Sequence, residues 1–441
     1  MKTTEALTIR KSDGRAKIKV TLSTGLGRLH FVQAANALHE AGVDLTVIQG
    51  WIPSKLLTDS VIDKLGTLIG SPGLSVGMNK RRLEFLPTGR NIGLAWPEII
   101  LTLLLITNRK IRISRGSASS IGWHLFGKAS QRHLNSPEVF HVRSGAGGGG
   151  AIQTARKNGA KIIVDHSIAH PDFLQSTLQQ EFLRAGRPIW FSTENPFWEQ
   201  VINDCKNTDV LLVNSHFVKS TFVERGFDPN KIVVSYLGVR KDFFGLKKQY
   251  DIKDERIQLL FTGQFGLRKG ARYLIEGLEM LAKQGIDFRL TVLGDASEAQ
   301  QFIKKSKISD RVQLLGFIPQ DALKSYLTAS DIYVFPSLGE GSASSAMEAM
   351  AAGLPVVSTL ETGLPAIHGK DALIIPAKDP TAIRDALLKL ATDEHLRRRL
   401  GQTAAKKISQ SYRWSDYGRN VTTLYQAITR ETDSIFLNPL K

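Results

Sequence analysis

The sequence predicts an α/β protein built from two doubly wound domains, each a parallel sheet with helices on both faces. Three observations lead to this prediction. The chain has 441 residues, about three times the length of a typical domain. Short apolar segments with strand character alternate with helical segments along both halves. A polar segment rich in Lys and Asp, residues 241–256, separates the two alternating runs and is predicted to be a linker.

The first domain is predicted to span residues 1–240. It opens with a strand at 18–23, a glycine-containing loop at 24–28 and a helix at 30–41, which Gly42 ends. The later strands of this domain are predicted at 44–48, 139–142, 162–165, 210–213 and 232–234.

Two glycine-rich loops in this domain leave their function open. Gly25 and Gly27 resemble the start of a dinucleotide fingerprint, but its third glycine would fall at His30, and the second strand ends at Gln49 rather than at a carboxylate. A nicotinamide or flavin site is therefore not expected. What remains is a glycine turn before a helix N-terminus, where N–H groups can face an anion or a sugar. The second loop, residues 144–150, either binds a phosphate through its backbone or is a flexible connection without a ligand.

The second domain is predicted at residues 257–414. Its strands are predicted at 257–261, 288–293, 312–315, 332–335, 355–358 and 373–375, and a long helical tail at 381–428. Two doubly wound sheets joined by a linker form a cleft between their carboxyl edges, where ligands bind.

Charge and composition narrow the function classes. Lys and Arg outnumber Asp and Glu by 58 to 41, and residues 1–240 alone hold 30 basic against 18 acidic residues. This excess suits nucleic acid, an anionic membrane surface or phosphorylated substrates. No zinc finger, aromatic RNA-binding motif or basic-helix array is present, so nucleic acid is not an expected partner. The single cysteine, Cys205, and an N-terminus without an apolar stretch predict a cytoplasmic protein.

The longest apolar stretch, residues 92–106, contains Pro97 and Glu98 and is too short to span a bilayer. The basic residues that flank it are Lys80, Arg81, Arg82, Arg90, Arg109, Lys110, Arg112 and Arg115. Two interpretations stay open. The stretch is either a buried helix with a solvated basic rim, or an interfacial segment on anionic lipid, which would make the protein peripheral on the cytoplasmic face of the inner membrane.

The most informative stretch is residues 335–355, where two carboxylates bracket a predicted helix start. A strand ends at Pro336, Glu340 lies in the loop, a helix begins near Ser344, and Glu348 follows in its first or second turn. The free N–H groups of a helix N-terminus suit a diphosphate. A carboxylate can bind vicinal hydroxyls through two charge-assisted hydrogen bonds. Together they indicate a nucleotide-sugar site, and the alternative is a helix-start Glu beside a solvated one.

The second half resembles family 4 glycosyltransferases, retaining enzymes of the GT-B fold, in which two Rossmann-like domains face a central cleft. Glu340 and Glu348 match that family's Glu-x7-Glu motif. The other matches are Gly263, Arg268-Lys269-Gly270, Gly316-Phe317-Ile318-Pro319, Ala329-Ser330-Asp331, Gly353-Leu354-Pro355 and Thr362-Gly363. The first half matches more loosely, through residues 214–218 and 226–239 and through Gly25-Leu26-Gly27.

This resemblance implies roles for individual residues. Glu348 would bind the nucleotide ribose and Glu340 the hydroxyls of the donor sugar, while the backbone near Phe317 and Ile318 would meet the base. The other donor-binding residues implied are Gly25, Gly27, Gly263, Ser344, Ser345, Thr362 and Gly363. Residues 415–441 would form a helix that crosses back to the first domain, as in similar folds. Neither a cofactor nor a metal is expected besides the nucleotide sugar.

The segment from Asp165 to His170 resembles a variant found in some bacterial members of the family. On that basis His170 would be the active-site histidine, and His166 would replace an arginine. From the residues alone, the two histidines could also be structural, or could bind a metal with Asp165. A strand end followed by a loop does not, however, place residues four apart on one face. Glu181 and Glu194 are expected to line the acceptor side.

One position departs from the family pattern. The arginine that usually follows the glycine of the first C-terminal loop is replaced by Gln264, while Arg268 stands beside Lys269. A diphosphate leaving group needs positive charge, so we expect Arg268 to take over this role. The alternative is a solvated Arg268 that points outward.

The residues and the resemblance together predict a retaining hexosyltransferase. It would move a sugar from a nucleotide-diphosphate sugar to a glycan or lipid-linked acceptor in cell-surface polysaccharide biosynthesis. Stabilisation of the leaving diphosphate by Arg268, Lys269 and the helix N-terminus near Ser344 would be the main catalytic effect. The alternatives are a sugar-nucleotide epimerase or phosphorylase of the same fold, and a catalytically silent scaffold in a polysaccharide assembly complex.

Overall fold

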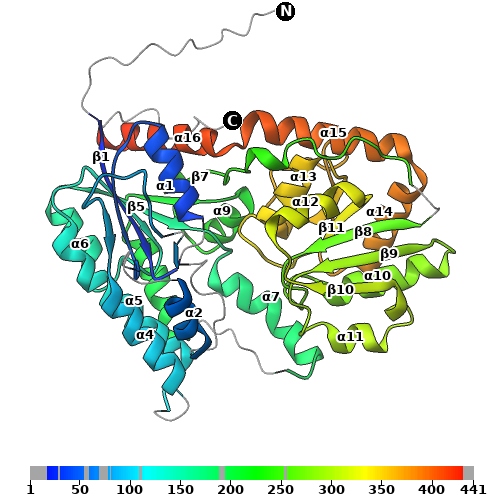
Figure 1. Ribbon diagram of the computed structural model, residues 1–441, viewed down its shortest axis with the longest axis horizontal. Coiled ribbons are helices and arrows are strands. Elements are labelled where there is room, and N and C mark those ends of the chain that lie inside the picture. Colours follow the sequence, from blue (N-terminus) through cyan, green and yellow to red (C-terminus); the bar gives the residue numbers. More distant parts are fainter. Residues whose placement is uncertain are drawn as a thin grey trace, which may run out of the picture.

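The computed structural model describes residues 17–27, 30–53, 59–68, 78–79, 81–108, 112–187, 194–252 and 256–430. Within these residues the chain forms two parallel sheets that lie side by side and are covered by helices (Figure 1). The predicted architecture of two doubly wound α/β domains is confirmed. Of the basic residues singled out in the sequence, Lys80, Arg109 and Lys110 lie outside the described residues.

The N-terminal sheet has seven parallel strands in the order β3-β2-β1-β4-β5-β6-β7. They are β1 (Lys19–Gly25), β2 (Asp44–Gln49), β3 (Asn91–Gly93), β4 (Val139–Arg143), β5 (Lys161–His166), β6 (Val210–Val213) and β7 (Ile232–Val234). Its helices are α1 (Phe31–Glu40), α2 (Asp59–Leu68), α4 (Ala95–Thr107), α5 (Arg115–Ser130), α6 (Ala151–Lys157), α7 (Pro171–Arg184), α8 (Pro196–Lys206) and α9 (His216–Val223). Only the short β3 had no counterpart among the predicted strands, because three residues carry too little periodicity to be recognised.

The C-terminal sheet has six parallel strands in the order β10-β9-β8-β11-β12-β13. They are β8 (Ile257–Thr262), β9 (Phe288–Leu293), β10 (Val312–Gly316), β11 (Ile332–Phe335), β12 (Val356–Thr359) and β13 (Leu373–Ile375). Its helices are α10 (Ala271–Lys283), α11 (Gln300–Lys305), α12 (Gln320–Ala329), α13 (Ser344–Ala352), α14 (Pro380–Thr392) and α15 (Glu394–Ser411).

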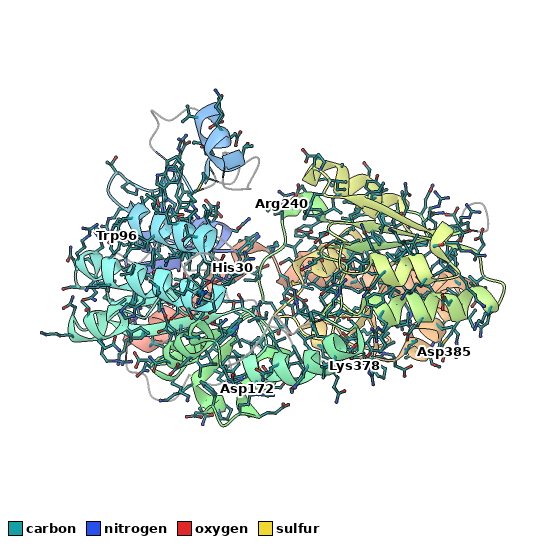
Figure 2. The ribbon with its side chains drawn as sticks, turned by 90° about the horizontal axis from the view of Figure 1, so that it is seen from below. His30, Trp96, Asp172, Arg240, Lys378 and Asp385 are labelled. Atoms are coloured by element: carbon teal, nitrogen blue, oxygen red, sulfur yellow. The ribbon has the colours of Figure 1, made fainter. Side chains whose placement is uncertain are left out.

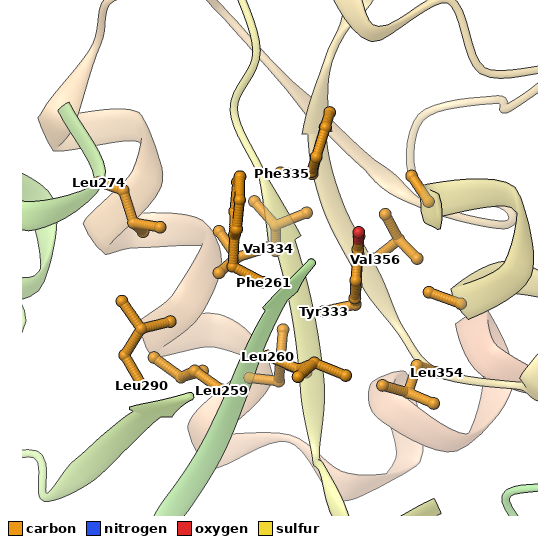
Figure 3. Close-up of a cluster of buried hydrophobic side chains, with 14 of the residues drawn as sticks. Leu259, Leu260, Phe261, Leu274, Leu290, Tyr333, Val334, Phe335, Leu354 and Val356 are labelled. Atoms are coloured by element: carbon orange, nitrogen blue, oxygen red, sulfur yellow. The ribbon is translucent and has the colours of Figure 1, made fainter. Parts of the chain in front are cut away.

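The core of the C-terminal domain surrounds its two central strands, β8 and β11 (Figure 3). Leu259, Phe261 and Phe335 are almost completely buried, and the rings of Phe261 and Phe335 stack with their centroids 5.1 Å apart. Both strands are apolar over nearly their whole length, as expected for strands covered on both faces. Their rigid ends, at Thr262 and Phe335, fix the two loops that carry the candidate site.

The predicted helical tail consists of three helices. Asp393 separates the first two, since it ends α14 and its side chain caps α15 by accepting a hydrogen bond from the backbone N–H of Leu396 at 2.8 Å. The third helix, α16 (Trp414–Thr429), runs back over the N-terminal domain, where Figure 1 shows it beside α1. Tyr417, Val421 and Tyr425 of α16 are buried in the N-terminal core. The chain thus passes twice between the domains.

Candidate functional site

A pocket of about 320 Å³ lies where the two domains meet. It is lined by His30 and Ser167, which follow β1 and β5, and by Ser344 and Glu348 of α13. Arg240, from the segment that connects the domains, completes it. Figure 2 shows His30 and Arg240 near the junction of the domains. Loops after parallel strands meet at the carboxyl edges of both sheets, so this pocket is where the fold is expected to bind a ligand.

A larger cavity, of about 710 Å³, lies elsewhere between the domains. Tyr236, Ile367, Lys407 and Tyr412 are among the residues that line it. Neither cavity is lined by Glu340, but the smaller pocket has Glu348 and the start of α13, which the larger cavity lacks. The smaller pocket, which has convergent charged groups, is therefore the better candidate site.

Glu348 lies one turn into α13, half-buried in the pocket wall. Burial raises the pKa of Glu348 to about 7, although the nearby Arg240 opposes this shift. The helix begins without a side-chain cap, and Ser344 at its start is exposed. An uncapped helix start presents N–H donors and a partial positive charge. The site therefore combines a helix end suited to an anion with a carboxylate whose negative charge is only partly compensated by nearby positive charge.

Glu340 sits in the loop after β11, where two cations hold its carboxylate. Arg268 donates to one oxygen through its Nη1, and the Nζ of Lys269 lies 2.5 Å from the same oxygen. Arg268 also donates to the carbonyl of Gly339 at 2.9 Å. Burial lowers the pKa of Lys269, against the pull of Glu340. Arg268 therefore points into the structure toward Glu340, and Gln264, at the position of the missing family arginine, is exposed.

The histidine that faces the pocket is His30, which was not among the expected site residues. Its Nε2 lies 3.3 Å from Oδ2 of Asp165, a fully enclosed carboxylate at the end of β5. The same oxygen lies 3.4 Å from Nε2 of His141, whose Nδ1 is 2.6 Å from the hydroxyl of Tyr425. Burial would raise the pKa of Asp165, but the two histidines hold it well below its ordinary value. A chain of polar groups thus runs from α16 to the pocket.

His170 and His166 do not have the positions expected of them. His170 caps α7 by accepting a hydrogen bond from the backbone N–H of Asp172 at 3.2 Å, and its ring packs against Phe222 and Phe227. His166 lies 2.9 Å from the hydroxyl of Ser144 and is also buried. Burial lowers the pKa of both histidines to about 4. Both rings are buried and neither is among the residues that line the pocket, so the active-site role of His170 stays a prediction that its place in this structure does not support.

The segment between these histidines nevertheless belongs to the site through its backbone. The N–H of Ala169 donates to the carbonyl of Glu340 at 3.2 Å. The hydroxyl of Ser215 donates to the carbonyl of Gly341 at 2.5 Å. Both bonds join the N-terminal domain to the loop that carries Glu340, so the position of Glu340 depends on how the two domains are packed.

The two carboxylates expected on the acceptor side are placed differently. Glu181 on α7 is fully buried, accepts a hydrogen bond from the hydroxyl of Tyr273 at 2.7 Å, and lies 3.4 Å from Nζ of Lys378. It connects the domains instead of lining an open surface, which corrects the expectation. Glu194 is exposed just before α8 and does not line the pocket.

The remaining donor-binding candidates divide by what their side chains contact. The hydroxyl of Thr362 is buried and donates to the carbonyl of Phe335 at 3.2 Å, so its side chain supports β11 rather than a ligand. Ser345 accepts a hydrogen bond from Tyr333 at 3.0 Å. Phe317 is 88% exposed at the end of β10, and Ile318 beside it is half-buried.

Close contacts explain several of the candidate glycines. A Cβ on Gly27 would lie 2.2 Å from the guanidinium of Arg143, and one on Gly363 would lie 2.0 Å from the carbonyl of Gly341. A Cβ on Gly25 would lie 2.2 Å from the ring of Trp123. At these three positions, in two loops, a neighbouring group lies too close to leave room for a side chain. Gly263 differs, because a Cβ there would have open space around it, and its φ of 119° is what favours glycine.

The glycine-rich loop at 144–150 binds an anion of the chain itself. Asp204 accepts hydrogen bonds from the backbone N–H groups of Gly145 at 2.7 Å and Gly147 at 2.9 Å. Burial raises the pKa of Asp204 to about 7 in spite of these two bonds. The amides of Gly145 and Gly147 therefore already have a carboxylate partner within the chain, which does not favour a phosphate at these two positions.

Two features are absent from the described residues. None of the helices in the described ranges is both long and apolar enough to cross a membrane. No cluster of three or more His, Cys, Asp or Glu side chains suited to a metal ion occurs in the same part of the chain.

The C-terminal half of the chain is similar in sequence to known proteins. Residues 242–407 match the model of the family described as Glycosyl transferases group 1. The amylovoran biosynthesis glycosyltransferase AmsK of Erwinia amylovora is 32% identical over 197 residues, which are 42% of this chain and 48% of AmsK. The putative colanic acid biosynthesis glycosyltransferase WcaL of Salmonella typhimurium is 27% identical over 232 residues, 50% of this chain and 57% of WcaL. The chain thus spans about half the length of these curated relatives.

Solved structures resemble the whole chain. Sucrose-phosphate synthase from Thermosynechococcus elongatus superposes with a TM-score of 0.61 at 16% identity, covering 93% of this chain and 99% of that one. HepE from Anabaena, solved in complex with UDP, gives a TM-score of 0.60 at 14% identity, covering 93% and 100%. At such identities the likeness concerns the fold. The chain therefore has the two-domain GT-B fold, and its C-terminal half is similar in sequence to group 1 glycosyl transferases.

Proposed function

We propose that the chain is a retaining glycosyltransferase that moves a sugar from a nucleotide-diphosphate sugar to a glycan or lipid-linked acceptor in cell-surface polysaccharide biosynthesis. The observation that carries the proposal is the shared pocket of Glu348, the uncapped start of α13 and His30. The relatives named for amylovoran and colanic acid biosynthesis support the polysaccharide context. The reaction would take place in the cytoplasm, at the inner face of the membrane if the acceptor is lipid-linked.

The donor binds to the C-terminal domain in this proposal. Glu348 accepts hydrogen bonds from the two ribose hydroxyls, and the N–H groups at the start of α13 bind the diphosphate. Glu340 binds hydroxyls of the donor sugar. Arg268 and Lys269, which both contact the carboxylate of Glu340, would then lie beside the sugar–phosphate bond.

The chemical step depends on charge stabilisation. As the sugar–phosphate bond breaks, negative charge develops on the diphosphate and positive charge on the sugar. Arg268, Lys269 and the helix end stabilise the diphosphate, while Glu340 lies near the oxocarbenium-like sugar. The acceptor hydroxyl then attacks from the face that the diphosphate leaves and gives its proton to the departing phosphate oxygen. The anomeric configuration is retained, and neither Glu has to act as a nucleophile. The N-terminal domain supplies the acceptor side, where His30 and Ser167 face the pocket.

UDP-glucose is the first donor to test, because HepE was solved with UDP and with UDP-glucose. Purified protein should bind UDP in calorimetry and release UDP slowly from UDP-glucose or from another nucleotide sugar found by thermal shift. With an acceptor, proton NMR should show an α-linked product from the α-linked donor. A Glu340→Gln variant should lose turnover while still binding UDP, and Glu199→Gln, an exposed change on α8, should behave as wild type.

Other outcomes identify the alternatives. Nucleotide binding without UDP release from any donor would indicate the scaffold. A donor converted to its epimer would indicate an epimerase. A β-linked product would refute retention.

A further inference from the structure

The most exposed apolar face of the described structure lies on α4. Trp96, Ile99, Leu103 and Ile106 are 42%, 51%, 56% and 54% exposed. Their spacing of three, four and three residues places them in one stripe along the helix. Ile121 on the neighbouring α5 is 39% exposed and extends this apolar area. We call these five residues the α4 stripe.

The helix beneath the stripe has little of its side-chain surface fully buried in the protein. Of the residues of α4, only Pro97 is buried. Its main attachment is α5, where Leu101 packs so closely on Gly122 that a Cβ at Gly122 would lie 2.7 Å from that of Leu101. A surface helix normally turns its apolar side to the core. Here apolar residues also cover the outer side, which marks an interaction surface.

The charged residues that α4 and α5 themselves expose beside the stripe are basic. No Asp or Glu occurs in the sequence between Glu98 and Glu138. The carboxylate of Glu98 is itself engaged, because Arg81 donates to it at 2.6 and 2.8 Å. Arg112 and Arg115, in the turn after α4 and at the start of α5, are exposed. Within α4 and α5 the apolar stripe is therefore bordered by exposed basic residues, and the one carboxylate of these two helices is paired.

We propose that the α4 stripe and its basic rim dock the protein on an anionic lipid bilayer. α4 has 13 residues, so at about 1.5 Å per residue it is too short to cross a bilayer and would lie in the interface. Two copies of the chain would bring equal basic rims together, which opposes a dimer through this face. A bilayer with acidic headgroups attracts the same rim.

The helix that carries the stripe begins at the edge of the sheet that carries the pocket. α4 follows directly on β3, so it begins at the carboxyl edge of the N-terminal sheet, the edge that also bears His30 and Ser167. Figure 2 shows Trp96 on the N-terminal domain, on the side away from the C-terminal domain. Docking through α4 leaves the C-terminal domain clear of the lipid. The inference goes beyond the proposed reaction, and its test needs no donor or acceptor.

The test is sedimentation of the full chain with vesicles. Vesicles of phosphatidylcholine with 30 mol% phosphatidylglycerol are compared with pure phosphatidylcholine, each at low and high salt. The wild type should bind the anionic vesicles only, and binding should fall with salt. Each lost basic residue should weaken binding about 5-fold, so Arg112→Gln with Arg115→Gln should weaken it about 25-fold. Ile99→Glu with Leu103→Glu should abolish binding.

Matched controls lie on other helices. Leu183→Glu changes a residue that is 64% exposed on α7, and Lys304→Gln with Lys305→Gln removes two exposed charges on α11. Both variants should bind as wild type. Tryptophan emission should shift to the blue on anionic vesicles, and Trp96→Phe should remove the shift. Circular dichroism confirms that each variant is folded.

Four results would overturn the proposal. They are no binding to either vesicle, equal binding to both, unchanged binding by the folded Ile99→Glu/Leu103→Glu variant, and equal loss in the control variants. A dimer that this variant abolishes, seen by analytical ultracentrifugation without lipid, would assign the stripe to a second copy instead.

Discussion

Replacing Glu348 with Gln should stabilise the free protein at alkaline pH and weaken its binding of nucleotide. In the folded chain burial raises the pKa of Glu348 from 4.5 to about 7. A raised carboxyl pKa favours the protonated form, so this group's contribution to stability is present below pH 4.5 and is lost as the pH rises through 7. At pH 8 the difference corresponds to about 3 kcal/mol, and at pH 5 to less than about 1 kcal/mol.

Glutamine has the same shape but no charge to desolvate, so Glu348→Gln should recover most of this energy at pH 8 only. For a domain of this size, about 3 kcal/mol corresponds to a rise in Tm of roughly 6–12 °C. The assay is thermal unfolding of both proteins at pH 5 and pH 8, with Glu199→Gln as the exposed control. Calorimetry with UDP should show affinity reduced by about 1.5–3 kcal/mol, the cost of a charged hydrogen bond.

Two results would refute this reasoning. An equal Tm difference at both pH values would mean that ionisation of Glu348 does not destabilise the folded protein. Unchanged UDP affinity would mean that Glu348 does not contact the nucleotide.

The other predictions concern neighbouring residues of the site. Arg268→Ala should slow turnover about 10²-fold by removing a donor to the leaving diphosphate, and adding Gln264→Arg should restore part of the rate in single-turnover assays. Wild-type turnover in the single variant would show that Lys269 and α13 suffice. His30→Gln should lower kcat and leave UDP affinity unchanged, and weaker UDP binding would contradict its placement on the acceptor side. His170→Ala should remove the cap of α7, lower the free energy of unfolding by about 1 kcal/mol or more, and lower Tm accordingly. Turnover per folded molecule should be unchanged. A large loss of kcat would support His170 as an active-site residue.

The strands and the Glu340–Glu348 stretch could be predicted because their signals are local. A strand buried on both faces is a short apolar run between turn residues, and such runs at 257–261 and 332–335 lie within one residue of β8 and β11. The start of α13 at Ser344 follows equally from local sequence, since a helix N-terminus depends on the residues that flank it. The eight-residue spacing of the two carboxylates then follows from the chain itself.

The direction of individual side chains could not be predicted in the same way. His166 and His170 lie within the expected segment, but Ser144, Phe222 and Phe227, distant in sequence, determine where their rings lie. The histidine that reaches the pocket is His30, at the place of the third fingerprint glycine. The sequence placed His30 in a loop that can face a ligand, but its contact with Asp165 is decided by the tertiary structure.

The sequence by itself determined the two-domain α/β architecture, the helix start at Ser344 and the pair of carboxylates that brackets it, because these depend on hydrogen-bonding and apolar patterns within a few residues. Only the tertiary structure decided which charges meet. Asp204 fills the glycine-rich loop, Arg268 turns inward to Glu340, and α4 leaves an apolar face uncovered. Such outcomes depend on groups that are far apart in the chain, and the desolvation of a charge or an apolar surface is set by everything packed around it.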